Sequence, residues 1–174
     1  MGTALVVIDV QQGMWGHPDY PPHDGDAVVE RIAGLIARAR GQGVPIFYVQ
    51  HDGGSDEALH PGKPGFAFHE KLTPEPGDDV TVKHHGSAFQ GTDFDAKLKR
   101  AGIDHLVVTG MQSEYCVDCA VRGAAERGYR VTVAGDAHST GDTKVLKAKQ
   151  IIDHHNHTWA GDFADVVPAS GVMF

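Results

Sequence analysis

Short apolar runs recur along the chain, separated by stretches in which apolar residues return at every third or fourth position. The runs are rich in β-branched residues and hardly alternate with polar ones, which is typical of strands buried on both faces of a sheet. They cover residues 4–10, 46–50, 79–83, 105–109, 130–134 and 164–167. The stretches with helical spacing predict helices over 28–39, 94–101, 117–124 and 145–159.

Strands that alternate with helices favour a parallel sheet with helices on both faces. We therefore predict an α/β fold of the Rossmann-like kind in a single domain over residues 1–174: a three-layer α/β/α sandwich around a mostly parallel sheet of five or six strands. Thr92 is placed to cap one helix, and Asp142 or Thr143 is expected to begin the last one. The stretch 51–78 is rich in Gly and Pro without a clear period, so we predict a long loop there.

The charge balance narrows the class of partner. The chain has 15 Lys and Arg against 23 Asp and Glu, a formal net charge of −8, and its basic residues are scattered. Such a surface repels phosphate groups, so we expect a small-molecule substrate rather than nucleic acid or an anionic membrane. No apolar stretch approaches the roughly 20 residues of a membrane span, and no basic segment precedes the first apolar run. We therefore expect a soluble, cytoplasmic protein.

Three reactive side chains are expected at one edge of the sheet. Asp9 comes at the end of the first predicted strand, Lys83 ends the third, and Cys116 lies in the first turn of the helix after the fourth. Ligands of open parallel sheets bind beyond the carboxyl ends of the strands. Each residue alone has an ordinary structural explanation, such as a cap or a small core residue. The coincidence of all three at strand ends favours an active site.

The chemistry of these residues fits acyl transfer to a cysteine nucleophile. A thiol at a helix start beside a lysine ammonium is favoured as thiolate, so we expect Cys116 to be activated. Asp9 is the candidate base that takes the thiol proton and returns it to a leaving amine. The backbone amides of Gln112 and Cys116, in the turn before the helix, are the candidates for an oxyanion hole.

Cys119 provides the main alternative. It lies three residues after Cys116, the spacing of thiol redox motifs at helix starts, so a thiol oxidoreductase that uses both cysteines is a second hypothesis. That hypothesis leaves Asp9 and Lys83 without a role, and the segment lacks the Trp and Pro typical of thioredoxin-like sites. We therefore interpret Cys119 as a helix-packing residue.

Several segments resemble the isochorismatase-like cysteine hydrolases. They are VVIDVQQG around Asp9, VKHHGSAFQGTDFDAKL around Lys83, VVTGMQSEYCVDCAVRGAAERGY around Cys116, DAHST at 136–140 and IIDHHN at 151–156. The resemblance spans essentially the whole chain and keeps the family's order of Asp, Lys and Cys. It implies an isochorismatase-like sandwich with a six-stranded parallel sheet, in which these three residues form the catalytic triad.

The resemblance also implies a reaction and its alternative. Members that keep the cysteine form a thioester and cleave amides, carbamoyl or ureido groups, or lactams, so Cys116 favours hydrolysis of an amide-type C–N bond. Isochorismate-cleaving members hydrolyse a vinyl ether instead, which is the alternative reaction. A cis peptide bond between Met111 and Gln112 is implied as well, and so is a homo-oligomer, either a dimer or a tetramer.

A metal site is a further alternative. The nicotinamidases of this family hold a metal ion with an Asp and a His two residues apart after the second strand, and with a further His. Here the stretch reads Gln50, His51 and Asp52. A zinc-type site of His51 with His60 or His69 is therefore not favoured, and we predict neither a metal nor another cofactor.

The substrate is expected to contact residues that neighbour the triad in sequence and combine aromatic faces with hydrogen-bonding groups. These residues are Gln12, Trp15, His51, Phe89 and Tyr115. His155 and Asn156, near the end of the last predicted helix, are expected to have a structural role or to contact another subunit.

Overall fold

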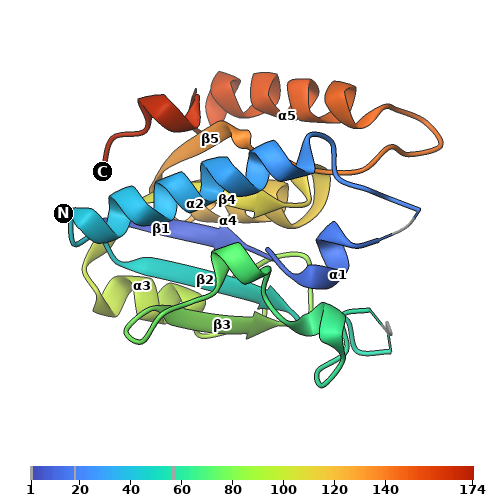
Figure 1. The fold of residues 1–174 in the computed structure, drawn as a ribbon. Helices are drawn as coiled ribbons and strands as arrows, with labels where there is room; N and C mark the ends of the chain where they lie inside the picture. The colour runs from blue at the N-terminus through green and yellow to red at the C-terminus, as the bar shows by residue number, and fades with distance from the viewer. Residues whose placement is uncertain (1, 18, 56–57) are drawn as a thin grey trace.

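Six parallel strands form one sheet in the computed structural model, which describes residues 2–17, 19–55 and 58–174 (Figure 1). In spatial order the strands are β3 (Asp79–Lys83), β2 (Ile46–His51), β1 (Gly2–Ile8), β4 (Ile103–Met111), β5 (Arg130–Ser139) and β6 (Asp165–Val167). Every neighbouring pair is parallel. The predicted α/β fold is confirmed.

Helices cover both faces of this sheet (Figure 1). Alternate residues of β1 supply the two cores: Leu5 packs towards α2, whereas Val6 packs towards α3 and α4. Trp159 of α5 belongs to the same core as α3 and α4. The helices are α1 (Gln12–Trp15), α2 (Gly25–Gly41), α3 (Phe94–Arg100), α4 (Asp118–Glu126) and α5 (Ala148–Asp162), and short 3-10 helices cover Pro64–Phe66, Glu70–Leu72 and Ala169–Gly171.

The strand order reverses between β1 and β4. From β1 the chain builds outward through β2 to β3, then returns to place β4 on the other side of β1. Ligands bind at such a reversal point, beyond the carboxyl ends of the two strands. Gly110 of β4 has φ of 125°, and a Cβ there would lie 2.1 Å from the Ile8 carbonyl oxygen. Only glycine allows β4 to approach β1 so closely at this point.

The fifth strand differs from the prediction. β5 continues to Ser139, whereas the sequence predicted an end at residue 134. Its pairing with β4 shifts register: Val108 pairs with Val133, but Gly110 pairs with His138. The intervening residues of β5 form a bulge, and the Gly and Asp in it look like the end of a strand in the sequence.

Helix starts were predicted with mixed success. The N-cap position of α3 is Asp93, which makes no side-chain capping bond, and Thr92 lies one residue earlier, where its hydroxyl accepts a hydrogen bond from the backbone amide of Phe94 at 3.3 Å. The last helix, in contrast, begins at Ala148 and not at Asp142 or Thr143. The Asp142 carboxylate instead accepts a hydrogen bond from the backbone amide of Ala148 at 2.9 Å. Asp142 therefore pairs with the first amide of the helix, although it lies six residues earlier in the chain.

The edge strand β3 is not buried on both faces as predicted. Val80 and Val82 are 38% and 43% exposed, whereas Thr81 and Lys83 are buried. Lys97 of α3 donates to the Thr81 hydroxyl at 3.0 Å, so the buried residues face α3. Lys83 therefore points into the molecule on the side that carries α3 and α4.

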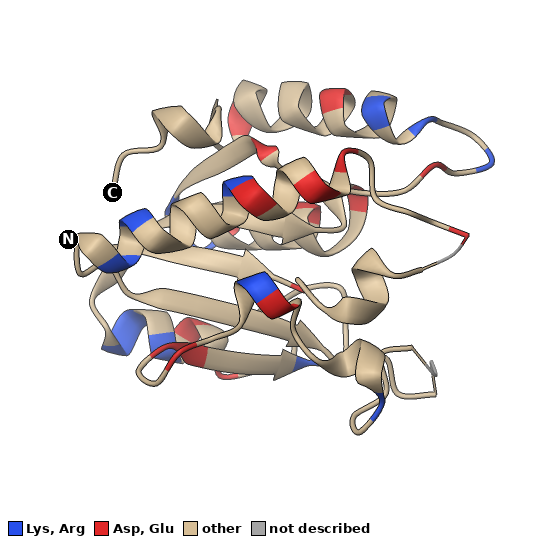
Figure 2. Ribbon diagram, viewed as in Figure 1, with Lys and Arg blue, Asp and Glu red and all other residues tan. Residues whose placement is uncertain are grey.

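Charged side chains are spread over the surface. Lys and Arg are interspersed with Asp and Glu along the helices and loops of this view and do not gather on one element (Figure 2). Within the described residues, no helix combines the length and the apolar character needed to cross a membrane.

Candidate active site

Asp9, Lys83 and Cys116 meet beyond the carboxyl ends of β1, β3 and β4. The Lys83 ammonium lies 2.9 Å from Oδ2 of Asp9 and 3.2 Å from Sγ of Cys116. Asp9 and Lys83 are 0% exposed, and Cys116 is 7% exposed. The structure thus brings together the three residues that the sequence analysis selected.

Each of the three is fixed by its local backbone. Asp9 follows β1 with φ of 49°, a left-handed conformation that Asp tolerates better than most residues, and its amide donates to the Val49 carbonyl at 2.9 Å. Lys83 is the last residue of β3. Cys116 lies in a π-helical turn, Ser113–Val117, between β4 and α4. We refer to this segment as the Cys116 turn.

Lys83 has further polar neighbours besides Asp9 and Cys116. Its ammonium also lies 3.2 Å from Nδ1 of His51 and 3.0 Å from the carbonyl oxygen of His85. An ammonium has three N–H donors for these four neighbours, and sulfur is the weakest acceptor among them. Lys83 is therefore a nearby positive charge for the Cys116 sulfur and a firm hydrogen-bond partner for the oxygen and nitrogen acceptors.

Burial dominates the electrostatics of the site. It raises the pKa of the Asp9 carboxyl above its ordinary value, against the effect of the Lys83 charge. Burial alone would lower the pKa of Lys83, but the negative charge of Asp9 and the hydrogen bonds to Asp9 and Cys116 act against it, so that pKa is raised. Burial, assisted by the charge of Asp9, raises the pKa of the Cys116 thiol to about 12.

Cys116 therefore rests as a neutral thiol beside a carboxyl group with raised proton affinity. The standing thiolate expected from the sequence is wrong, because burial and the Asp9 charge exceed the effect of Lys83. Oδ1 of Asp9 has no hydrogen-bond partner among the described residues. Its free acceptor capacity suits a group that takes up a proton during a reaction.

A cavity of about 380 Å³ opens onto the Cys116 sulfur, a volume suited to a small molecule. Polar, aromatic and aliphatic side chains share its wall, as in most sites for organic ligands. The lining residues are Gly13, Met14, His17, Tyr20, His51, Ala58, Leu59, Gly86, Gln112, Tyr115 and Cys116.

Two of the five predicted substrate contacts, His51 and Tyr115, line this cavity. The other three do not. Phe89 turns into the core, where its ring centroid lies 5.1 Å from that of Phe94. Trp15 donates through Nε1 to the Gly25 carbonyl at 3.3 Å and packs against the core on the α2 side.

Gln12 is the third residue outside the cavity wall. It begins α1, where its amide donates to the Ala67 carbonyl at 2.8 Å, and the following residues Gly13 and Met14 line the cavity instead. Nearness in sequence to a catalytic residue does not determine which side of a loop or short helix a side chain takes.

Gln11 is a site residue that the sequence analysis missed. It is 0% exposed, and its side chain brackets the backbone of His51: Nε2 donates to the His51 carbonyl and Oε1 accepts the His51 amide, both at 2.9 Å. Nε2 also donates to the Phe66 carbonyl at 3.0 Å. Gln11 thereby fixes His51 and the first 3-10 helix beside the cavity. The available signal was a polar residue two positions after Asp9, directly after Val10 ends the apolar run.

The backbone around Gln112 is unusual. The peptide bond between Met111 and Gln112 is cis, and Gln112 lines the cavity. The amide of Val117 donates to the Gln112 carbonyl at 3.1 Å, which is the i to i−5 pattern of a π-helical turn. The backbone amide of Cys116 lies one residue before the Val117 amide that makes this bond. Its use as an oxyanion-hole donor stays a prediction.

No metal-binding group assembles among the described residues: nowhere in 2–17, 19–55 and 58–174 do three His, Cys, Asp or Glu side chains lie in position for one ion. His69 instead packs against the Trp15 ring with 5.8 Å between ring centroids, and Nδ1 of His60 lies 2.8 Å from the Pro61 carbonyl oxygen. The zinc alternative with His51 finds no support in this arrangement.

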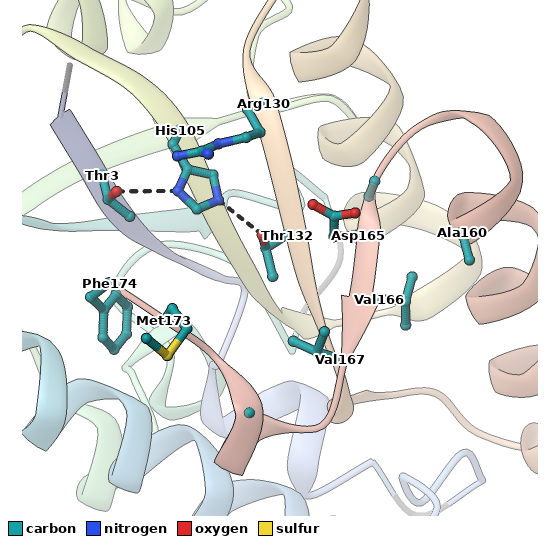
Figure 3. A pocket seen from close by; sticks show the side chains of 12 residues that line it. Thr3, His105, Arg130, Thr132, Ala160, Asp165, Val166, Val167, Met173 and Phe174 are labelled. Atoms are coloured by element: carbon teal, nitrogen blue, oxygen red, sulfur yellow. Dashed lines mark hydrogen bonds between the residues drawn. The ribbon is translucent and has the colours of Figure 1, made fainter.

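A larger cavity, of about 620 Å³, lies at the opposite edge of the sheet, where the strands begin (Figure 3). His105 lies at its wall, held between the hydroxyls of Thr3 at 3.1 Å and Thr132 at 2.9 Å. The wall includes Arg130 and Asp165 but neither a cysteine nor a lysine. Size therefore does not select the reactive site, and the smaller cavity beside Cys116 is the candidate.

Comparisons with known proteins agree with the geometry. A family model described as the isochorismatase domain matches residues 3–155. The uncharacterised isochorismatase family protein YddQ of Bacillus subtilis is 35% identical over 159 residues, which is 90% of this chain and 88% of that protein. A streptothricin hydrolase of Streptomyces noursei is 34% identical, over 96% of this chain and 55% of that protein.

Two further relatives extend this likeness. A ureidoacrylate amidohydrolase, RutB of Methylobacterium radiotolerans, is 30% identical over 98% of this chain and 80% of that protein. Among solved structures, an isochorismatase from Pseudomonas putida KT2440 superimposes with a TM-score of 0.92 at 32% identity and covers 98% of this chain and 90% of that one.

Proposed function

We propose, since the chain belongs to the isochorismatase family of hydrolases, that it cleaves an amide-type C–N bond of a small molecule through a thioester on Cys116. One observation carries the proposal: the Lys83 ammonium lies within 2.9 Å of Asp9 and 3.2 Å of the Cys116 sulfur, at a cavity that admits a small molecule. Nucleophile, base and positive charge are then in contact before substrate binds.

Acylation begins from the neutral thiol. As the Cys116 sulfur attacks the carbonyl carbon of the substrate, its proton passes to the Asp9 carboxylate, whose raised pKa favours uptake. Lys83 keeps its proton and stabilises the negative charge that develops on sulfur as the proton leaves and that passes to the carbonyl oxygen when the C–S bond forms. The C–N bond then breaks, and the proton on Asp9 goes to the leaving nitrogen, which departs as ammonia or an amine.

Deacylation reverses these roles. Water attacks the thioester carbon while Asp9 takes a proton from it, the C–S bond breaks, and the proton on Asp9 returns to the Cys116 sulfur. The acid product leaves and the neutral thiol is restored. In both halves the carbonyl oxygen becomes negative, and the backbone amides of Gln112 and Cys116 are our candidates to stabilise that charge.

The activities for which two relatives are named support a C–N bond as the target. One relative is an amidohydrolase of ureidoacrylate, and another hydrolyses streptothricin. The vinyl-ether reaction is less favoured, because acid-catalysed ether cleavage would leave the Cys116 thiol at the cavity without a role.

A thiol oxidoreductase is also less favoured. Cys116 and Cys119 are both free thiols, and Cys119 is absent from the wall of the cavity. Burial and the neighbouring charge of Asp118 raise the pKa of Cys119, whereas redox-active thiols in such motifs have lowered values. We therefore interpret Cys119 as part of the packing of α4.

The test is a screen of primary amide, carbamoyl, ureido and lactam compounds, with the purified protein and its Cys116→Ala variant. We expect Cys116→Ala to lower kcat by at least about 10³-fold with the fold intact, because the covalent route is lost. Mass spectrometry of the rapidly quenched wild-type protein should find the acyl group on the peptide that contains Cys116.

Cys119→Ala is the matched control and should keep the wild-type rate. Turnover by Cys116→Ala at the wild-type rate would refute the covalent route. Loss of activity in Cys119→Ala as complete as in Cys116→Ala would favour the oxidoreductase hypothesis instead.

A further inference from the structure

A buried histidine beside the Cys116 turn has no part in the proposed reaction. His138, near the end of β5, is 1% exposed, and its ring packs edge-on against Trp159 of α5 with 5.1 Å between ring centroids. Nδ1 lies 2.8 Å from Oγ of Ser113, the first residue of the Cys116 turn, and Nε2 lies 2.9 Å from Oδ1 of Asn156 on α5. The imidazole therefore bridges the turn to α5.

The hydrogen bonds around His138 fix the position of every proton. Asn156 donates through Nδ2 to the Gly135 carbonyl at 2.8 Å, so its Oδ1 faces the ring and accepts from Nε2–H. In a neutral imidazole Nδ1 then carries a lone pair, and Ser113 must donate its hydroxyl proton to it. Burial lowers the pKa of His138 to about 4, so the ring is neutral near pH 7 and has this one tautomer.

The surrounding backbone is shaped to admit Asn156. Gly135 lies in the bulge of β5, and a Cβ there would lie 2.8 Å from a Val166 methyl carbon and within 3.2 and 3.4 Å of the Asn156 amide atoms. A side chain at this position would push Asn156 away from His138. The bulge and its glycine thus make room for the connection between α5 and β5.

The Cys116 turn is also tied down elsewhere. The Trp159 indole donates to Oδ1 of Asp118 at 2.7 Å, and Asp118 follows the turn directly as the first residue of α4. Glu114, within the turn, accepts the Thr140 hydroxyl at 2.9 Å. Elements α5 and β5 therefore hold the turn at its beginning, in its middle and at its end.

We propose that His138 is a positioning residue for hydrolysis: together with Asn156 it holds Ser113, and thereby sets the place of the Cys116 sulfur and of the Gln112 amide. The inference rests on the proposed function, in which Cys116 attacks the substrate. A displacement of about 1 Å at a reacting group can cost about 10²-fold in rate, so a rigid support for the turn has catalytic value. His138 itself touches neither the substrate cavity nor the sulfur in the described contacts.

The experiment compares three variants, all in a Cys119→Ala background. Ser113→Ala removes the hydroxyl. His138→Gln reaches towards Asn156 but loses the acceptor for Ser113, whereas His138→Asn places an oxygen near the site of Nδ1 and keeps that acceptor. We expect Ser113→Ala and His138→Gln to lower kcat by about 10- to 100-fold with KM nearly unchanged, and His138→Asn to retain most of kcat.

Alkylation of Cys116 by iodoacetamide supplies a readout that needs no substrate. Cys116 is 7% exposed as a residue, so a loosened turn should make alkylation faster while turnover becomes slower. His155→Gln is the matched control: His155 packs against the same Trp159 ring at 5.4 Å but does not contact Ser113. It should change neither rate, and denaturation by urea should report the stability of every variant.

The outcomes separate the two proposals. If Cys116→Ala is inactive but Ser113→Ala and His138→Gln keep wild-type turnover and alkylation rates, the positioning role is overturned and the hydrolase remains. If Cys116→Ala is active, the proposed function itself fails. If Ser113→Ala does not fold, the two His138 variants test the proposal instead. An equal loss of kcat in His138→Asn and His138→Gln, in proportion to their loss of stability, would show that His138 is purely structural.

Discussion

Two histidines are buried at opposite ends of the same sheet, and they differ in what they hold. His105 lies near the start of β4 between the hydroxyls of Thr3 and Thr132, on strands that flank it. His138 lies near the end of β5 between Ser113 and Asn156, which belong to a turn and a helix outside the sheet. Burial lowers the pKa of both imidazoles.

The contribution of a buried polar group depends on how firmly its hydrogen-bond partners are already held. The partners of His105 are already fixed by the backbone hydrogen bonds of the parallel strands, so its own bonds add only local stability. The Cys116 turn lies outside the sheet and has only its own π-helical backbone bonds, so the side-chain bonds from its surroundings contribute more to its position. The same contrast applies to the cavities, because the larger one lies beside His105 and the reactive groups lie beside the smaller.

Replacing Lys83 is the strongest test of whether the reactive groups lie beside the smaller cavity. Lys83→Met keeps the unbranched chain up to the ε position and removes the ammonium charge that stabilises the ionised Asp9, so the base should become protonated and stay so. We expect kcat to fall by about 10²- to 10⁴-fold, the range attributed to general acid–base catalysis. Steady-state kinetics on the best substrate of the screen will measure it.

Lys97→Met is the control for Lys83→Met. Lys97 also pairs with β3, through Oδ1 of Asp79 at 3.0 Å, but at the surface and at the other end of the strand. Its replacement should leave kcat unchanged and cost at most about 1 kcal/mol of stability. Equal losses of activity in the two variants would place the reactive site elsewhere, for example at the cavity beside His105.

The dependence of folding stability on pH provides a second test, which concerns the buried His138. The pKa of His138 falls from 6.5 to about 4 on folding, mainly through burial, with the charge of His155 acting in the same direction and that of Asp136 and the Asn156 bond opposing it. Above pH 6.5 the histidine is neutral in both states and costs nothing. As the pH falls from 6.5 towards 4, only the unfolded chain takes up the proton, and stability should fall by about 3 kcal/mol.

His138→Asn isolates this contribution. The difference in free energy of unfolding between wild type and variant, measured by urea denaturation from pH 7 to pH 4, should shrink by about that amount as the pH falls. His105 shifts in the same direction, so its contribution is shared by both proteins and cancels in the difference. A difference that is independent of pH would contradict a neutral, buried His138.

The sequence predicted how the three candidate catalytic residues come together better than it predicted the residues that hold them in place. Asp9, Lys83 and Cys116 could be found because parallel strands deliver their carboxyl ends to one edge, so a position in the chain becomes a position in space. Phe89 was misplaced because no such rule governs a loop side chain. The thiolate was wrong because burial, which the sequence does not measure, outweighs a nearby lysine.

The connection between His138 and Asn156 was not predicted for a different reason, although Asn156 itself was expected to have a structural role or to contact another subunit. The bulge in β5 interrupts the apolar run, so the prediction ended the strand at residue 134 and left His138 in a loop. Asn156 was expected near a helix end, but it lies inside α5 and binds across to the bulge. A contact between a bulge and a helix depends on tertiary packing, which no local pattern encodes. The DAHST run, which contains His138, and the IIDHHN run, which contains Asn156, were the sequence features that marked the place.

Thr132→Val is expected to have the smallest effect on activity, and it compares the two histidines most directly. It removes a hydroxyl that lies 2.9 Å from Nε2 of His105, just as Ser113→Ala removes one that lies 2.8 Å from Nδ1 of His138. Each variant should cost about 1 kcal/mol of stability in urea denaturation, the usual net value of a buried hydrogen bond. Thr132→Val should leave kcat unchanged, because β4 and β5 remain paired without the hydroxyl, whereas Ser113→Ala should lower it. Equal effects of the two variants on turnover would mean that rate follows stability alone, and would remove the distinction between the two histidines.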